Sequence, residues 1–456
     1  MRDTKEQING ITQGVIWKQL LIFFFPLLLG TFFQQLYNTV DAIIVGRFAG
    51  KEALSAVGGA TGTLINVFVG FFIGISTGAT VTISQFYGGG NKEEVSKAVH
   101  TAIAMAIVGG AAIMVVGIIG APIALRWMGT PEDIMDQSLI FIRIIFGGMI
   151  ANLIYNVGAG ILRAIGDSKR PLYILMASVG INIILDFIFV IGFHWNVAGV
   201  GCATVISQIF SACMVCGRLM RTKECYQLRL SNIRFYKGML PRIIRIGLPA
   251  GFQSLMYTST NVIIQANMNS FGTNTIAAWT AYSKIDGVFW MMISSFGISI
   301  TTFVGQNFGA GFYDRVRRGV KVCLRIAMAA SLGLIIILYF GGTYIYGLFT
   351  TDPQVIEKGM EILRLLVPTF WTYVFVEIYS GSLRGMGNSL LPMIITSLGV
   401  CALRVVWLFT VVPIWPSVRT VIVSYPLTWS VTSILFIFYY HYYVKKNGIG
   451  IRRPTV

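Results

Sequence analysis

The stretch GILRAIGDSKRP, residues 160–171, returns as GSLRGMGNSLLP at residues 381–392, an offset of 221 positions. The same offset aligns SQFYGGGNKEEVSKAV (84–99) with GQNFGAGFYDRVRRGV (305–320). Chance similarity between apolar segments would explain one such match, but not several in one register. The chain therefore contains two copies of one structural plan.

Composition identifies an integral membrane protein. Of the 456 residues, 55% are hydrophobic and 12% are charged, whereas a soluble domain carries about 25% charged residues. About twelve apolar runs are long enough to cross a bilayer as helices. No small-residue cleavage site follows the N-terminal segment, so we expect the first span to be retained. We predict an all-α fold with twelve transmembrane helices.

Each copy of the repeat holds six of the predicted spans. An even number returns the chain to the same side of the membrane, so the copies are parallel repeats related by an axis along the membrane normal. The sequence then divides into an N-terminal bundle (1–220), a basic cytoplasmic linker (221–242) and a C-terminal bundle (243–456). Two similar bundles that face each other leave a central cleft, which is the architecture of a secondary transporter.

Basic residues gather on one side of the predicted membrane. The formal net charge is +17. With the N-terminus inside, about 26 of the 35 Lys and Arg residues fall in inner loops and about five in outer loops, which is the positive-inside bias. We therefore expect both termini to be cytoplasmic, and the positive charge to face the lipid bilayer rather than nucleic acid.

Sequence motifs of enzyme chemistry are not found. The chain has neither GxxxxGK[ST] nor HExxH, and its three histidines lie far apart. The six cysteines fall mostly in apolar helix, where cysteine packs as a small hydrophobic residue. We expect neither an enzyme nor a bound cofactor.

Two carboxylates, Asp41 and Asp186, stand inside predicted spans, where a charged side chain is costly and usually functional. At 1.5 Å per residue, Asp41 lies about 9 Å below the outer end of its span, Asp186 about 11 Å and Thr204 about 10 Å. Asn182 is one helical turn from Asp186 on the same face. Polar groups from three helices therefore meet at one level.

This set of oxygen ligands suits two kinds of cation. It forms either a cage for a monovalent ion such as Na⁺ or a pair of acids that shares a proton. We assign cation coupling to Asp41, Asn182, Asp186 and Thr204, with H⁺ and Na⁺ both left open. For Asn182 and Thr204 alone, hydrogen bonds that join helices are an equal alternative. For the acids that alternative is weaker, because burial of a carboxylate costs far more than burial of an amide.

The first span supplies further candidates. Pro26 removes a backbone hydrogen bond and kinks the helix. It is either a static kink or a hinge that moves when Asp41 is neutralised. Polar side chains that we expect to contact substrate or to take part in gating are Gln34, Tyr37, Asn38 and Asn156.

Charges also stand in the predicted spans of the C-terminal bundle. They are Lys284, Asp286, Glu377 and Arg404. Lys284 and Asp286 are two residues apart, so they point to different sides of their helix. Arg404 lies at about the depth of Asp286, and we expect these charges to form structural salt bridges rather than a substrate site.

Five segments carry a resemblance to a known family: QQLYNTVDAIIVGRFAGKEALSAVG (34–58), SQFYGGGN (84–91), RAIGDSKRP (163–171), NIILDFIFVIG (182–192) and VGQNFGAG (304–311). Together they resemble the multidrug and toxic compound extrusion (MATE) family, in its prokaryotic DinF-like branch, over nearly the whole chain. The resemblance implies twelve helices in two six-helix lobes. It also implies an antiporter that expels organic, often cationic, molecules against an inward flow of H⁺ or Na⁺.

The resemblance also implies roles for particular residues. Members of that branch carry an acid on the first helix and another, usually within NxxxDP, on the fifth. These positions fall on Asp41 and on Asn182 with Asp186. Phe187 stands where the family usually has proline, so we expect the fifth helix to be less bent. Ile264 aligns with Asp41 in the second repeat, which confines the coupling acids to the first.

Other functions compete with this interpretation. A lipid-linked oligosaccharide flippase of the same superfamily would tend to have more helices and a strongly cationic cleft. A channel is less consistent with acids placed in one repeat. A major facilitator transporter has a different loop where this chain has FYGGGNKEEVSKA (86–98). We expect a monomeric, multi-pass protein of a bacterial or archaeal inner membrane that exports small molecules.

Overall fold

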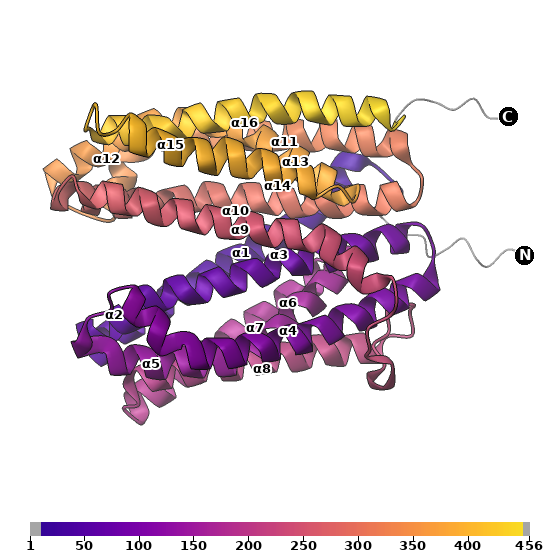
Figure 1. Cartoon of the computed structure of the whole chain (residues 1–456), viewed down its shortest axis with the longest axis horizontal. Helices are drawn as coiled ribbons and strands as arrows, with labels where there is room; N and C mark the ends of the chain where they lie inside the picture. Colours follow the sequence, from indigo (N-terminus) through magenta and orange to yellow (C-terminus); the bar gives the residue numbers. More distant parts are fainter. Residues whose placement is uncertain (1–10, 450–456) are drawn as a thin grey trace, which may run out of the picture. The chain divides into compact units, whose positions relative to one another are not determined.

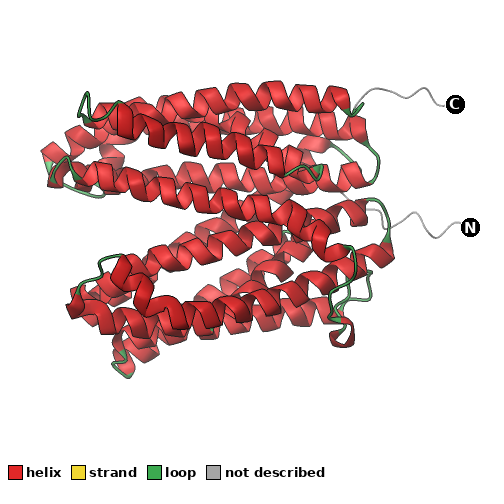
Figure 2. Ribbon diagram, in the orientation of Figure 1, coloured by secondary structure: helices red, strands yellow, loops and turns green. Residues whose placement is uncertain are grey.

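The computed structural model describes residues 11–449. All regular secondary structure in this part of the chain is helical (Figures 1 and 2). Sixteen α-helices, α1 to α16, are joined or interrupted there by five short 3-10 or π-helical segments, η1 to η5. The all-α fold class predicted from the sequence is confirmed.

The chain forms two units, which we call the N-lobe (Phe25–Gly251) and the C-lobe (residues 11–24 with residues 252–449). The N-lobe contains most of α1 (Ile16–Ile44), η1 (Val45–Ala49), α2 (Gly50–Gly58), α3 (Ala60–Gly88), α4 (Lys92–Trp127), α5 (Glu132–Gly147), α6 (Met149–Ala164), α7 (Lys169–Asp186), η2 (Phe187–Gly192), α8 (Asn196–Arg221), η3 (Leu230–Asn232) and the start of α9 (Met239–Asn269). The C-lobe contains the rest of α9, α10 (Thr273–Gly309), α11 (Tyr313–Gly347), α12 (Pro353–Leu366), η4 (Val367–Thr369), α13 (Phe370–Gly385), α14 (Leu390–Thr396), η5 (Ser397–Ala402), α15 (Leu403–Thr410) and α16 (Val418–Lys446).

The number of membrane-crossing segments agrees with the sequence. Ten segments of residues 11–449 are long and apolar enough to cross a bilayer. An eleventh is added if α5 and α6, which meet at a bend of 47°, form one broken span. The 31-residue helix α9 is longer than α8 (26 residues) but is not among these segments. With α9, these segments account for the twelve expected spans.

The two repeats share their turn geometry. Gly90 and Gly311 both have positive φ angles (73° and 75°), as do Gly166 and Gly387 (98° and 89°). Glycine adopts this region without the penalty that a Cβ brings. After Gly166, the N–H of Asp167 donates to the carbonyl five residues back (2.9 Å), and the second repeat makes the same helix-ending bond. The duplication of sequence is therefore also a duplication of backbone structure.

Helices α1 and α9 each contribute to both lobes, and each changes lobe beside a proline, Pro26 or Pro249. Before this change, α1 packs in the C-lobe, where the ring of Phe24 stacks on Phe296 of α10 with centroids 4.0 Å apart. The sequence division into 1–220 and 243–456 had assigned each helix to one bundle. It did not anticipate the lobe against which the first turns of each helix pack.

The start of α9 crosses α3 through glycines. Gly74 and Gly78 lie one turn apart on α3, and Gly247 and Gly251 have the same spacing on α9. A Cβ at Gly74 would overlap the backbone of Gly251, and Gly78 meets Gly247 in the same way. Small residues at this spacing let membrane helices approach closely. This contact explains why residues 243–251 belong to the N-lobe.

The basic linker is docked on the N-lobe. The N–H of Arg229 donates to Nε2 of His100 at 3.0 Å, and the N–H of Tyr236 donates to Oγ1 of Thr101 at 3.2 Å. Nδ1 of His100 contacts the carbonyl of Ser96 at 2.7 Å. Because Nε2 accepts, the proton of the ring is assigned to Nδ1. The linker composition indicated a lipid-facing segment and carried no sign of this docking.

Candidate functional site

The four residues assigned to cation coupling lie together in the N-lobe. Asp41 is on α1, Asn182 and Asp186 are in the last turns of α7, and Thr204 is on α8. Asn182 and Asp186 are both 0% exposed and Thr204 is 8% exposed, whereas Asp41 is half-buried. Residue counting placed these side chains at one depth, and the structure brings them together in one cluster. We call these four residues, together with Tyr37, the acid cluster.

Asn182 stands between the two acids. With its side-chain nitrogen turned toward them, it donates to Oδ1 of Asp41 at 3.0 Å and to Oδ2 of Asp186 at 3.3 Å. The two carboxyl groups also lie within hydrogen-bonding reach of each other. Ionised carboxylates have acceptors and no donor. Their contact therefore requires a proton or a cation between them.

Tyr37 links the acids to α8. Its hydroxyl donates to Oγ1 of Thr204 at 3.0 Å and lies within hydrogen-bonding reach of Asp41. The sequence placed Tyr37 among candidates for substrate contact or gating. The structure places it inside the acid cluster, because Tyr37 and Asp41 are one turn apart on α1 and share a face.

One acceptor of the acid cluster lacks a partner. Oδ1 of Asp186 is buried and receives no hydrogen bond from residues 11–449. The two carboxyl groups can hold a shared proton or, with the amide oxygen of Asn182 turned toward them, a Na⁺ ion. In the same part of the chain, no three His, Cys, Asp or Glu side chains gather as metal ligands.

Both acids precede π-helical turns. The segment η1 begins four residues after Asp41, η2 begins directly after Asp186, and the two segments contact each other. Such turns widen a helix locally and are frequent at functional sites. Phe187, which replaces the proline typical of the family, is the first residue of η2. The fifth span is therefore irregular at this point even without a proline.

The other N-lobe candidates lie outside the acid cluster. Pro26 is buried within α1, and Gln34 and Asn38 are exposed on the same helix. The amide nitrogen of Asn156 donates to the carbonyl of Asn152 on its own helix at 2.9 Å. Within the described chain, Gln34, Asn38 and Asn156 make no hydrogen bond to the acids. Their assignment to substrate contact or gating stays a prediction.

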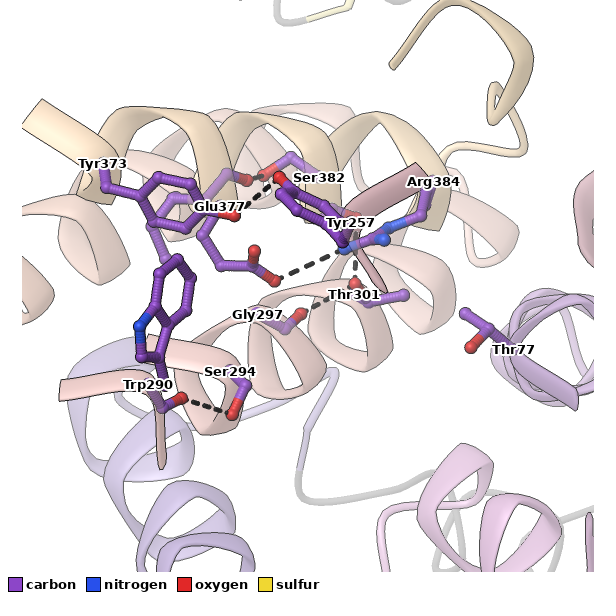
Figure 3. Close-up of polar contacts among 12 residues, drawn as sticks. Thr77, Tyr257, Trp290, Ser294, Gly297, Thr301, Tyr373, Glu377, Ser382 and Arg384 are labelled. Carbon is purple, nitrogen blue, oxygen red and sulfur yellow. Dashed lines mark hydrogen bonds and ion pairs between the residues drawn. The ribbon is translucent and has the colours of Figure 1, made fainter. Parts of the chain in front are cut away.

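The charges predicted in the C-terminal bundle have different surroundings. Lys284 is exposed, so it is not a buried charge. Glu377 accepts from Nη2 of Arg384 at 3.4 Å (Figure 3). Gly297 of α10 makes room for this pair, because a Cβ there would overlap the Glu377 carboxylate. Sequence reasoning missed Arg384 as the partner, although seven residues are two helical turns and place both side chains on one face of α13.

Asp286 and Arg404 do not form the expected salt bridge: no ion pair joins them in the structure of residues 11–449. Asp286 accepts from Nε1 of Trp290 at 2.6 Å and from the hydroxyl of Tyr282 at 3.4 Å. Nη2 of Arg404 donates to Oγ1 of Thr428 at 2.9 Å. Both charges are held by neutral neighbours. Equal depth along two helices does not fix the direction of either side chain, which is why the pairing was predicted wrongly.

A sequence model of the MatE family matches residues 26–188 and 249–410. The two matches begin at Pro26 and Pro249, the positions where α1 and α9 change lobe. Probable multidrug resistance protein YoeA of Bacillus subtilis is 29% identical over 452 residues, which cover 95% of each chain. Probable multidrug resistance protein NorM of Thermotoga maritima is 26% identical over 411 residues, 87% of this chain and 86% of that one.

Solved structures share the fold over nearly the full length. A crystal structure of MATE in the bent conformation aligns with a TM-score of 0.89 at 21% identity, covering 96% of this chain and 97% of the other. The outward-facing conformation of a multidrug resistance MATE family transporter of the MOP superfamily aligns with the same TM-score at 20% identity, covering 96% and 98%. The duplicated sequence, the two lobes and the family match over both repeats lead to one conclusion: the chain belongs to the MatE, or multidrug and toxic compound extrusion, family of membrane transporters.

Proposed function

We propose that this multi-pass membrane protein is an antiporter that exports small organic molecules by alternating access, driven by inward movement of H⁺ or Na⁺. The observation that carries the proposal is the buried contact between Asp41 and Asp186 with Asn182 bridging them. Such a site gains and loses one positive charge within the membrane-spanning part of the N-lobe. Binding of that charge can therefore bias the conformation of the helices that supply the side chains.

One feature favours a proton over Na⁺ as the occupant. The carboxyl groups lie close enough to share a hydrogen bond, which a proton completes. Na⁺ remains the alternative, with the amide reversed so that Asp41, Asn182, Asp186 and Thr204 supply oxygen ligands.

The proposed substrates are organic, cationic or amphipathic small molecules. The relatives in Bacillus subtilis and Thermotoga maritima are both described as probable multidrug resistance proteins. The lipid-linked oligosaccharide flippase is not favoured, since the family match and these relatives both indicate multidrug transport. We further propose that the chain lies in a bacterial or archaeal inner membrane with both termini cytoplasmic.

We also propose that α1 bends at Pro26 during transport. Solved structures with this fold include MATE in a bent conformation, MATE in a straight conformation and a MATE P26A mutant. In this chain Pro26 stands two residues after the C-lobe part of α1 ends and fifteen before Asp41. A change of charge at Asp41 would then act on the helix segment that begins at the proline.

Efflux from proteoliposomes tests the proposal. The purified protein is reconstituted into liposomes that are loaded with a fluorescent organic cation, 4′,6-diamidino-2-phenylindole. A pH gradient and a Na⁺ gradient are then imposed across the liposome membrane in separate experiments. We expect efflux with one of the two gradients and none when an ionophore collapses it. Equal efflux with and without a gradient would exclude coupling, and ohmic currents far above transporter turnover would identify a channel.

A further inference from the structure

The C-lobe contains a cavity of about 470 Å³ that the acid cluster does not use. Pockets that hold drug-sized ligands have volumes of about 300–1,000 Å³, so the cavity is large enough for an organic molecule. Its walls are rich in aromatic side chains, which include Tyr257, Trp279, Tyr282, Trp290, Tyr425 and Trp429. Figure 3 shows Trp290 and Tyr257 with Tyr373, which also lines the cavity.

Arg404 brings a buried positive charge to this cavity. The residue is 3% exposed, and its guanidinium lies 3.8 Å from the centroid of the Tyr425 ring. It donates to Thr428, but its Nε has no acceptor in residues 11–449 and no carboxylate there pairs with it. A buried charge normally has a counter-ion, because an unpaired one is costly. The guanidinium therefore has the capacity to bind an oxyanion.

Asp286 brings the opposite charge to the same cavity. Its two oxygens accept from Trp290 and Tyr282, both neutral donors. These hydrogen bonds stabilise the carboxylate without neutralising it. The aromatic rings around it also attract cations through their π faces. The wall near Asp286 therefore suits an ammonium group.

We infer that this cavity is a binding site for a zwitterionic organic ligand, whose carboxylate pairs with Arg404 and whose ammonium group lies by Asp286 among the aromatic rings. A purely cationic ligand would leave Arg404 without a counter-ion, and a purely anionic one would be repelled by Asp286. The planar guanidinium matches a carboxylate through two parallel hydrogen bonds. The site lies within the C-lobe alone and does not rest on the coupling chemistry proposed for the N-lobe.

A matched set of ligands tests this inference on the purified full-length protein in detergent. The zwitterions are 4-(aminomethyl)benzoate and its longer analogue 4′-(aminomethyl)biphenyl-4-carboxylate. The comparison ligands replace either the ammonium or the carboxylate group with methyl. Binding is measured by calorimetry and by quenching of tryptophan fluorescence, to which Trp279, Trp290 and Trp429 contribute from the cavity wall. We expect at least one zwitterion to bind about tenfold or more tightly than both of its singly charged analogues.

Variants then assign the two ends of the ligand. Arg404→Gln should lower the affinity for the zwitterion to that of the amine, and Asp286→Asn should lower it to that of the carboxylate. Asp167→Asn, in the partly exposed pair with Arg170 of the N-lobe, is the control and should leave binding unchanged. If a variant does not fold, the comparison among ligands on the native protein still tests whether the cavity prefers a zwitterion. Equal affinity for all ligands, or a zwitterion affinity unchanged in both folded variants, would overturn the inference. These binding measurements use no ion gradient. Their outcome therefore does not bear on the coupling proposal, which the efflux experiment tests.

Discussion

Asn182 is the residue that makes the acid cluster a single unit. It is fully buried and offers two N–H groups to two carboxyl groups on different helices. A neutral amide can hold the acids in place but cannot cancel their charge. The charge state of the pair therefore follows the ion or proton that occupies it, and replacement of either acid by its amide should remove that dependence.

Asp41→Asn tests the acid cluster directly. The variant keeps the shape of the side chain but cannot gain or lose a proton. We expect gradient-driven efflux to fall by about tenfold or more, since the transport step no longer carries a charge. The melting temperature should stay unchanged or rise, because an ionised carboxylate is no longer removed from water. Asp167→Asn, in the partly exposed pair with Arg170, should transport normally. Near-native efflux by Asp41→Asn would refute the assignment.

At the scale of the element, the crossing of α3 and α9 depends on the absence of side chains. Gly78→Ala places a methyl group against the backbone of Ile243 and Gly247. We expect a loss of about 1–3 kcal/mol, typical of overpacking, measured as a lower melting temperature. The control is Gly217→Ala on α8, where a Cβ would meet nothing within 4 Å. That substitution should be neutral or stabilising, since alanine favours helix over glycine. Equal melting temperatures for the two variants would show that the crossing tolerates a side chain.

Pro26→Ala tests whether α1 acts as a hinge. Alanine restores the backbone donor and favours a straight helix. We expect slower turnover with little change in substrate affinity, because the substitution alters the bending of α1 and removes no polar side chain. Pro122→Ala, in the interior of α4, is the matched control and should have a smaller effect on turnover. A native transport rate in Pro26→Ala would leave Pro26 as a static kink.

At the scale of the whole molecule, the lobes exchange the starts of α1 and α9. We expect cleavage in the linker to leave one particle, because each half of the chain supplies a segment to the lobe formed mainly by the other half. A protease site inserted after Ser231, which is exposed in η3, allows the cut to be made in the folded protein. The two fragments should then elute together in size-exclusion chromatography. Separation into two species in mild detergent would contradict the exchange.

The sequence was enough to predict the fold class, the duplication and the proximity of Asp41, Asn182, Asp186 and Thr204, but not the place of Tyr37 beside them. Hydropathy and the repeat are visible along the chain, and acids are rare in membrane helices. It was not enough to predict the surroundings of Asp286 and Arg404, the docking of the linker on His100, or the lobe to which 243–251 belongs. Each of these depends on side-chain direction or on contact between residues far apart in the chain, which no local pattern encodes.

The exchange of helix starts also constrains the order in which the protein is made. Residues 11–24 leave the ribosome well before their partners, which include Phe296 and Arg315, more than 270 positions later in the chain. The N-lobe in turn lacks the glycine face of α9 until Gly251 has been translated and inserted. Neither lobe can therefore complete its packing from one half of the chain alone. The nascent chain must therefore hold an unfinished first lobe in the membrane until the second has begun to form.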